Sequence, residues 1–262
     1  MNQFTLRHLS LAYDVCGAGP SVLLIHGFPL TGRMWSPIVE PLARSYRLII
    51  PDLRGYGESQ AGATATIIDF ADDAAALLDH LGETGPVVVV GLSMGGYIAF
   101  EFLRRHRERV RALGLIDTRA EGDTPEAAKG RRDQAQRVRA DGAKVVADGM
   151  RDKLFGPRVD PAVKQAWFET MAGANPKAVA ATLEGLADRF DFTPTLGQID
   201  VPTLIVVGED DVITPPAGAR AMHRAIPGAV IEVIPECGHV PPLEQPERFV
   251  RVLKRWLDGL LG

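Results

Sequence analysis

Residues 87–96 read Val87-Val88-Val89-Val90-Gly91-Leu92-Ser93-Met94-Gly95-Gly96. The four valines form an uninterrupted β-branched run, which is typical of a central parallel strand covered on both faces. Residues 97–105 then follow a helical pattern. The stretch therefore predicts a buried strand, a tight turn and a helix, the repeating unit of a parallel α/β sheet.

Ser93 stands at the turn of this unit, with Gly91 and Gly95 on either side in the spacing G-x-S-x-G. A turn that holds a serine in a strained conformation needs neighbours that carry almost no side chain. The serine would also lie at a helix N-terminus, where free N–H groups and the helix dipole favour developing negative charge. An ordinary Gly-Ser turn has the same spacing, so the nucleophile hypothesis depends on the rest of the chain.

Length and composition indicate one sizeable globular domain. The chain has 262 residues, 46% of them hydrophobic and 24% charged, so it can bury a large core without disulfides.

Its net charge of −4 predicts neither nucleic acid nor a membrane surface as a partner. The two cysteines, Cys16 and Cys237, lie too far apart in sequence to suggest a cysteine metal site. Because no apolar run approaches bilayer length and no signal-peptide pattern is present, the expected location is the cytoplasm.

Apolar runs and helical patterns alternate along residues 1–118 and again along 197–262, which predicts a doubly wound, mostly parallel eight-stranded α/β sheet. The expected strands lie at 4–8, 11–15, 22–25, 48–50, 87–90, 110–116, 202–207 and 230–234. The expected helices lie at 35–45, 67–81, 97–105, 217–225 and 246–261. Residues 119–196 hold charged, alanine-rich helical stretches between prolines, and we expect them to form a helical lid inserted into the core domain.

Three reactive side chains follow apolar strands at the point where each strand ends: Ser93, Asp211 and His239. Open parallel sheets bind their ligands at this edge. A serine hydroxyl is a poor nucleophile at neutral pH, so it needs a base such as histidine within hydrogen-bond reach. The imidazole in turn needs a carboxylate that fixes its tautomer. The three residues together predict a catalytic triad.

Five motifs together resemble the α/β-hydrolase fold family over essentially the whole chain. They are His26-Gly27-Phe28-Pro29, the segment from Asp52 to Ser59, the segment from Gly91 to Gly96, the segment from Gly208 to Asp211, and Gly238-His239. By this resemblance Ser93 is the nucleophile, His239 the general base and Asp211 the orienting acid. The resemblance also implies an oxyanion hole formed by the backbone N–H groups of Phe28 and Met94. It specifies the fold closely and the substrate poorly.

Two other carboxylates compete with Asp211 for the role of the acid. Asp210 is adjacent, and Asp117 follows an earlier strand after which some members of the family carry their acid. We prefer Asp211 because it stands three residues after Gly208 and four before Pro215, as the family's acid does. We expect His26, Asp52, Arg54 and Cys237 to have structural roles.

A serine at position 93 narrows the expected reaction. Relatives that open epoxides or remove halide carry an aspartate there, so the resemblance implies hydrolysis of a carboxylic ester through an acyl-enzyme, without metal or organic cofactor. A lactone hydrolase similar to 3-oxoadipate enol-lactonases and a cofactor-free haloperoxidase or perhydrolase remain open. A small-molecule receptor and a cofactor-free lyase are further alternatives on this fold. The expected partner is a small ester or lactone, and the sequence does not fix the oligomeric state.

The expected substrate pocket lies between the serine and the lid. Leu30 and the bulky lid residues Trp167 and Phe168 are the candidates for its walls. We expect such walls to leave room for small acyl groups only, although apolar stripes on helices more often serve plain packing.

Overall fold

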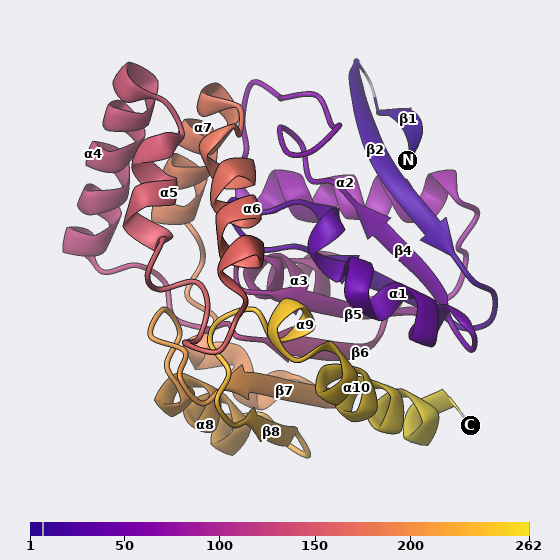
Figure 1. Cartoon of the computed structure of the whole chain (residues 1–262). Helices are drawn as coiled ribbons and strands as arrows, with labels where there is room; N and C mark the ends of the chain where they lie inside the picture. The colour runs from indigo at the N-terminus through magenta and orange to yellow at the C-terminus, as the bar shows by residue number, and fades with distance from the viewer. Residues whose placement is uncertain (7, 262) are drawn as a thin grey trace.

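The computed structural model describes residues 1–6 and 8–261, which form one eight-stranded sheet flanked by helices (Figure 1). The order of the strands across the sheet is β1-β2-β4-β3-β5-β6-β7-β8. The strands are β1 (Asn2–Leu6), β2 (Leu9–Cys16), β3 (Ser21–Ile25), β4 (Arg47–Pro51), β5 (Val87–Leu92), β6 (Val110–Ile116), β7 (Thr203–Gly208) and β8 (Val230–Ile234). The predicted eight-stranded α/β sheet is confirmed; Arg7, within the first predicted strand, lies outside the described residues.

Strands β4, β3, β5, β6, β7 and β8, in this order across the sheet, are parallel. At one edge, β2 pairs antiparallel with both β1 and β4. In the parallel part, Ile25 pairs with Gly91 and Leu92 pairs with Ile116, so neighbouring strands end at nearly the same level. The loops after β3, β5, β6, β7 and β8 therefore meet along one edge of the sheet, which is where the candidate reactive residues stand.

Strand β5 separates two hydrophobic cores because its side chains alternate between the faces of the sheet. Val89 belongs to one cluster and Val88 and Val90 to the other, and every residue of the strand is buried. The first cluster is covered by α2 (Ile67–His80), α3 (Met94–Arg105) and α8 (Pro216–Ala225). The second is covered by α1 (Ser36–Ala43) and α10 (Pro246–Leu261), with α9 (Pro241–Glu244) beside them. Among the described residues no helix is both long enough and apolar enough to traverse a bilayer.

The segment between β6 and β7 forms four α helices, and all of its residues are described. They are α4 (Pro125–Asp141), α5 (Lys144–Met150), α6 (Pro161–Ala172) and α7 (Pro176–Ala187). Three of the prolines start helices: the side chains of Thr124, Asp160 and Asn175 cap α4, α6 and α7, each directly before a proline. Figure 1 shows α4 to α7 gathered together beside the end of the sheet toward which the arrow of β7 points.

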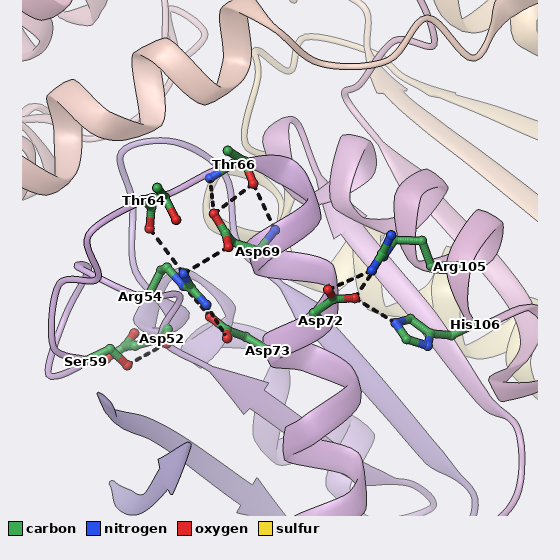
Figure 2. A network of polar contacts seen from close by, with 10 residues as sticks. All are labelled: Asp52, Arg54, Ser59, Thr64, Thr66, Asp69, Asp72, Asp73, Arg105 and His106. Atoms are coloured by element: carbon green, nitrogen blue, oxygen red, sulfur yellow. Dashed lines mark hydrogen bonds and ion pairs between the residues drawn. The ribbon is translucent and has the colours of Figure 1, made fainter. Parts of the chain in front are cut away.

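The loop after β4 is fastened to α2 by an ion-pair network (Figure 2). The Nε and Nη2 atoms of Arg54 each donate to the carboxylate of Asp73 at 2.6 Å, and Nη1 lies 3.2 Å from Asp69. Asp69 also forms the capping box of α2 with Thr66. Burial raises the pKa of Asp73 in spite of the hydrogen bonds from Arg54. The ionised form of Asp73 therefore depends on the guanidinium of Arg54.

We predict that Arg54→Met lowers the free energy of unfolding by about 3 kcal/mol, because it leaves the buried carboxylate of Asp73 without its cation. The matched control is Arg105→Met, which removes an exposed bidentate pair with Asp72 and should cost less than about 1 kcal/mol. Urea unfolding of both variants measures the difference. Equal losses would contradict the structural role of Arg54.

Candidate active site

The edge of the sheet holds the three predicted reactive residues on neighbouring loops. Ser93 follows β5, Asp211 follows β7 and His239 follows β8. The N–H of Ser93 donates to the carbonyl of Ile116 at 2.9 Å, which ties the serine turn to the end of β6. Asp117, the rival acid, comes directly after that strand. One edge therefore brings the serine, the histidine and both candidate carboxylates to adjacent strand ends.

The serine turn is strained and closely packed. Ser93 has φ 54° and ψ −113°, a backbone conformation that is unfavourable for any residue with a side chain. A Cβ atom at Gly91 would lie 2.0 Å from the carbonyl oxygen of Gly95, and one at Gly95 would lie 2.2 Å from that of Ile25. The two glycines of the G-x-S-x-G spacing are therefore required by close backbone contacts. Helix α3 begins at Met94, directly after the serine.

A hydrogen bond of 2.8 Å joins Nδ1 of His239 to Oδ2 of Asp211, and both side chains are almost completely buried. The Asp211 carboxylate also accepts hydrogen bonds from the N–H groups of Ile213 at 2.8 Å and Thr214 at 3.0 Å. The hydroxyl of Thr214 donates to Oδ2 at 2.6 Å. Burial alone would raise the pKa of Asp211, but the bonds from His239 and Thr214 outweigh it and lower the pKa well below its usual value. Asp211 is therefore ionised and oriented toward the imidazole.

Asp117 is buried beside this pair and differs from Asp211 in its hydrogen bonds. Its Oδ1 accepts from the N–H of Gly208 at 2.8 Å, whereas its Oδ2 has no hydrogen-bond partner among the described residues. Burial and the nearby charge of Asp211 raise the pKa of Asp117 well above its usual value. The raised pKa favours the neutral form of Asp117, which stabilises an imidazolium less well than a carboxylate does. The electrostatics therefore favour Asp211 over Asp117 as the acid.

One ligand atom each from Asp117, Asp211 and His239 lies within 4.8 Å of the others, a spacing that could surround a cation. Two of these atoms are already joined, however, by the hydrogen bond between Asp211 and His239. The hydrogen bond between Asp211 and His239 explains why these two residues lie together, and the buried carboxyl group of Asp117 lies next to them.

Asp210 and Cys237 lie close to the pair and contact each other through the backbone. The side chain of Asp210 is exposed, and its N–H donates to the carbonyl of Cys237 at 2.8 Å. The Cys237 thiol is buried, and burial raises its pKa far above its usual value. A thiol that does not ionise is no nucleophile, which agrees with the structural role expected for it.

Glu244 holds the histidine loop in place and was not among the residues predicted from the sequence. Its carboxylate accepts hydrogen bonds from the N–H groups of Gly238 at 2.8 Å and Val240 at 2.9 Å, the residues on either side of His239. It also accepts from the N–H of Gly156 at 2.9 Å. Gly156 lies between α5 and α6 in the segment that joins β6 to β7, called the inserted segment below. A glutamate five residues after the histidine is an ordinary surface pattern in sequence, so only the fold reveals this function. Thr214 was missed for the same reason.

The loop after β3 lies against the serine turn. A Cβ atom at Gly27 would come within 3.3 Å of the Cβ of Ser93. His26 braces this loop: its Nε2 accepts from the N–H of Leu53 at 3.0 Å, and its Nδ1 lies 2.9 Å from the carbonyl of Gly27. Burial lowers the pKa of His26, so the imidazole stays neutral in this role. The loop carries Phe28 to the cavity beside the serine.

A cavity of about 380 Å³ opens beside Ser93, and Phe28 and Met94 lie on its wall with the serine. Most of the remaining wall comes from the inserted segment. Its apolar side chains on α5 and α7 are Val146, Met150, Leu183 and Leu186. The volume is at the lower end of the range for small-molecule sites.

The predicted pocket residues Leu30, Trp167 and Phe168 do not lie on this wall. The N–H of Leu30 closes a turn onto the carbonyl of Gly27, and its side chain is fully buried in the core under α1 and α10. Trp167 and Phe168 lie on α6, which packs against the same core, and Phe168 borders a different cavity. This prediction was wrong because periodicity gives the apolar face of a helix but not the element that it covers.

The chain is similar to known proteins over nearly its whole length. A thermophilic esterase from Thermogutta terrifontis, described as malate bound, is 44% identical with a TM-score of 0.95, and the match covers 97% of this chain and 95% of that one. The enol-lactonase from Burkholderia xenovorans is 25% identical with a TM-score of 0.90, covering 98% and 100%. The pimeloyl-[acyl-carrier protein] methyl ester esterase of Neisseria meningitidis is 29% identical over 245 residues, 91% of this chain and 93% of that protein.

A family match spans most of the chain. Residues 20–246, from the turn before β3 to the start of α10, match the alpha/beta hydrolase fold family. This range contains the serine turn, both candidate acids and the histidine loop. The chain belongs to the alpha/beta hydrolase fold family.

Proposed function

We propose that the protein hydrolyses carboxylic esters of small molecules through an acyl-enzyme on Ser93. The observation that carries this proposal is the buried hydrogen bond between His239 and an ionised Asp211, on the same sheet edge as the strained serine turn. A histidine held in this way has one tautomer, with Nε2 available as a base. Ser93 opens onto a cavity of a size suited to a small substrate.

In this mechanism His239 takes the proton from Ser93 Oγ as the oxygen attacks the ester carbonyl. Asp211 remains ionised and stabilises the imidazolium that forms. The backbone N–H groups of Phe28 and Met94 are the proposed donors to the oxyanion, since the helix N-terminus at Met94 favours developing negative charge. His239 then gives the proton to the leaving alcohol, and water releases the acid from the serine by the same steps.

The relatives support an ester hydrolase on this fold, because two of the three named above are esterases. A lactone is a cyclic ester, so a lactonase reaction needs the same residues, and the similar enol-lactonase keeps that alternative open. Perhydrolysis or haloperoxidation would use the same acyl-enzyme. A receptor would bind ligand without turnover, and a lyase would act on cyanohydrins and not on esters. Assays on esters, lactones, cyanohydrins and peracid formation separate these alternatives.

We further propose that residues 119–196 act as a lid on a core domain formed by 1–118 and 197–262. The helices α4, α5 and α7 contribute wall residues to the cavity at Ser93. The carbonyl of Leu154 also accepts a hydrogen bond from the N–H of His239 at 3.1 Å. The inserted segment thus contacts both the proposed base and the proposed substrate cavity.

We predict that kcat/KM falls steadily from acetyl and butyryl to octanoyl and palmitoyl esters. The apolar walls formed by Val146, Met150, Leu183 and Leu186 close a small cavity, and each unaccommodated methylene costs about 1 to 3 kcal/mol of discrimination. The measurement is kcat/KM on p-nitrophenyl esters, with Ser93→Ala as the control for turnover at the serine. A maximum at the palmitoyl ester would contradict the small cavity and leave the triad untouched.

We predict that Asp211→Asn lowers kcat by about 10⁴-fold, because the amide no longer fixes the tautomer of His239 or stabilises the imidazolium. Asp210→Asn is the matched control, since its side chain is exposed, and Asp117→Asn replaces a carboxyl group whose raised pKa favours the neutral form. Both should lose far less activity. Steady-state kinetics on one short-chain ester measures all three variants. A loss at Asp117→Asn as large as that at Asp211→Asn would move the acid to the end of β6.

A further inference from the structure

The cavity beside Ser93 is lined by cations although the chain as a whole is acidic. Arg119, Arg131 and Lys153 lie on its wall, and within the described residues no aspartate or glutamate does. The formal net charge of the protein is −4. The three cations come from different elements: Arg119 from the loop after β6, Arg131 from α4 and Lys153 from the segment after α5. Their convergence on one small cavity therefore does not follow from a single charged helix face.

Carboxylates neutralise these three cations only in part. Nε of Arg131 donates to Asp123 at 2.5 Å, but the same carboxylate also binds the buried guanidinium of Arg189 at 2.5 Å. Asp123 is thus shared between two guanidinium groups, and Asp191 also lies near Arg189. Arg119 donates to the uncharged backbone carbonyl of Ile213. Lys153 is exposed at the rim and forms no ion pair in the part of the chain that the structure describes.

The cavity wall combines apolar side chains with positively charged ones. Met94, Met150, Leu183 and Leu186 provide apolar wall around the serine, and the cations provide positive charge on the same wall. The hydroxyl of Thr118 donates to the carbonyl of Ser93 at 2.7 Å. Because Arg119 follows Thr118 directly, the backbone of Arg119 lies close to the serine turn. A short apolar chain that ends in an anion would satisfy both features. Guanidinium and ammonium groups bind carboxylates with charge-assisted hydrogen bonds.

We propose that this cavity selects esters whose acyl chain carries a free carboxylate, as the half-esters of short dicarboxylic acids do. The inference rests on the proposed esterase function and specifies its substrate class. Ser93 attacks the ester carbonyl at one end of the chain, and Arg119, Arg131 and Lys153 bind the carboxylate at the other. Water is consumed, the acyl–oxygen bond breaks, and the products are the dicarboxylate and the alcohol.

The test compares two substrates that differ in one charge, monomethyl glutarate and dimethyl glutarate, at neutral pH and low ionic strength. Methanol release gives kcat/KM for each. We expect the half-ester to be preferred by roughly tenfold or more, the equivalent of one good charge-assisted contact. The preference should shrink as salt screens the charges.

Variants test the residues that hold the carboxylate. Arg119→Gln and Lys153→Gln should each reduce the ratio of half-ester to diester activity several-fold. The matched controls are Arg132→Gln, whose side chain pairs with Asp188 away from the cavity, and Lys177→Gln on the exposed side of α7. Both controls should keep the wild-type ratio.

A ratio near one, with both esters hydrolysed, would overturn this inference and leave the esterase proposal intact. An undiminished ratio in both cavity variants would also overturn it, because other groups would then select the anion. If neither glutarate ester nor p-nitrophenyl acetate is hydrolysed, the proposed function itself fails and the inference fails with it.

Discussion

The burial of strand β5 on both faces is the constraint on which the rest of the structure depends. Val88, Val89 and Val90 point alternately into two cores, so helices must cover both sides of the sheet. Parallel strands joined by such helices all end at one edge, and this edge receives the loops with Ser93, Asp211 and His239. The proposed active site is in this sense a consequence of how the central strand is buried.

The proposed acid and base are held by groups that do no chemistry themselves. Hydrogen bonds from His239 and Thr214 lower the pKa of Asp211 in spite of burial, whereas Asp117, which accepts one hydrogen bond from the N–H of Gly208, has a raised pKa. Glu244 binds the backbone on both sides of His239 and also the inserted segment. The histidine loop and the helices over the cavity are therefore coupled through one carboxylate.

The sheet, the helical nature of the insertion and the strand-end positions of Ser93, Asp211 and His239 could be predicted from local sequence patterns, whereas the choice of Asp211 over Asp210 and Asp117 came from the resemblance to the α/β-hydrolase fold family. Apolar runs mark where strands end, and close backbone contacts require the glycines around the serine. The cavity walls could not be predicted, since they depend on how α4 to α7 pack on the core. Trp167 and Phe168 were therefore misplaced, and the wall cations Arg119 and Lys153 passed unnoticed.

The central claim is that Ser93 carries the acyl group. Its most direct test is covalent labelling with an alkyl fluorophosphonate, followed by intact-protein and peptide mass spectrometry. The account predicts one adduct per chain, located on Ser93, and no adduct on a folded Ser93→Ala variant. An adduct on any other residue, or equal labelling of that variant, would contradict it.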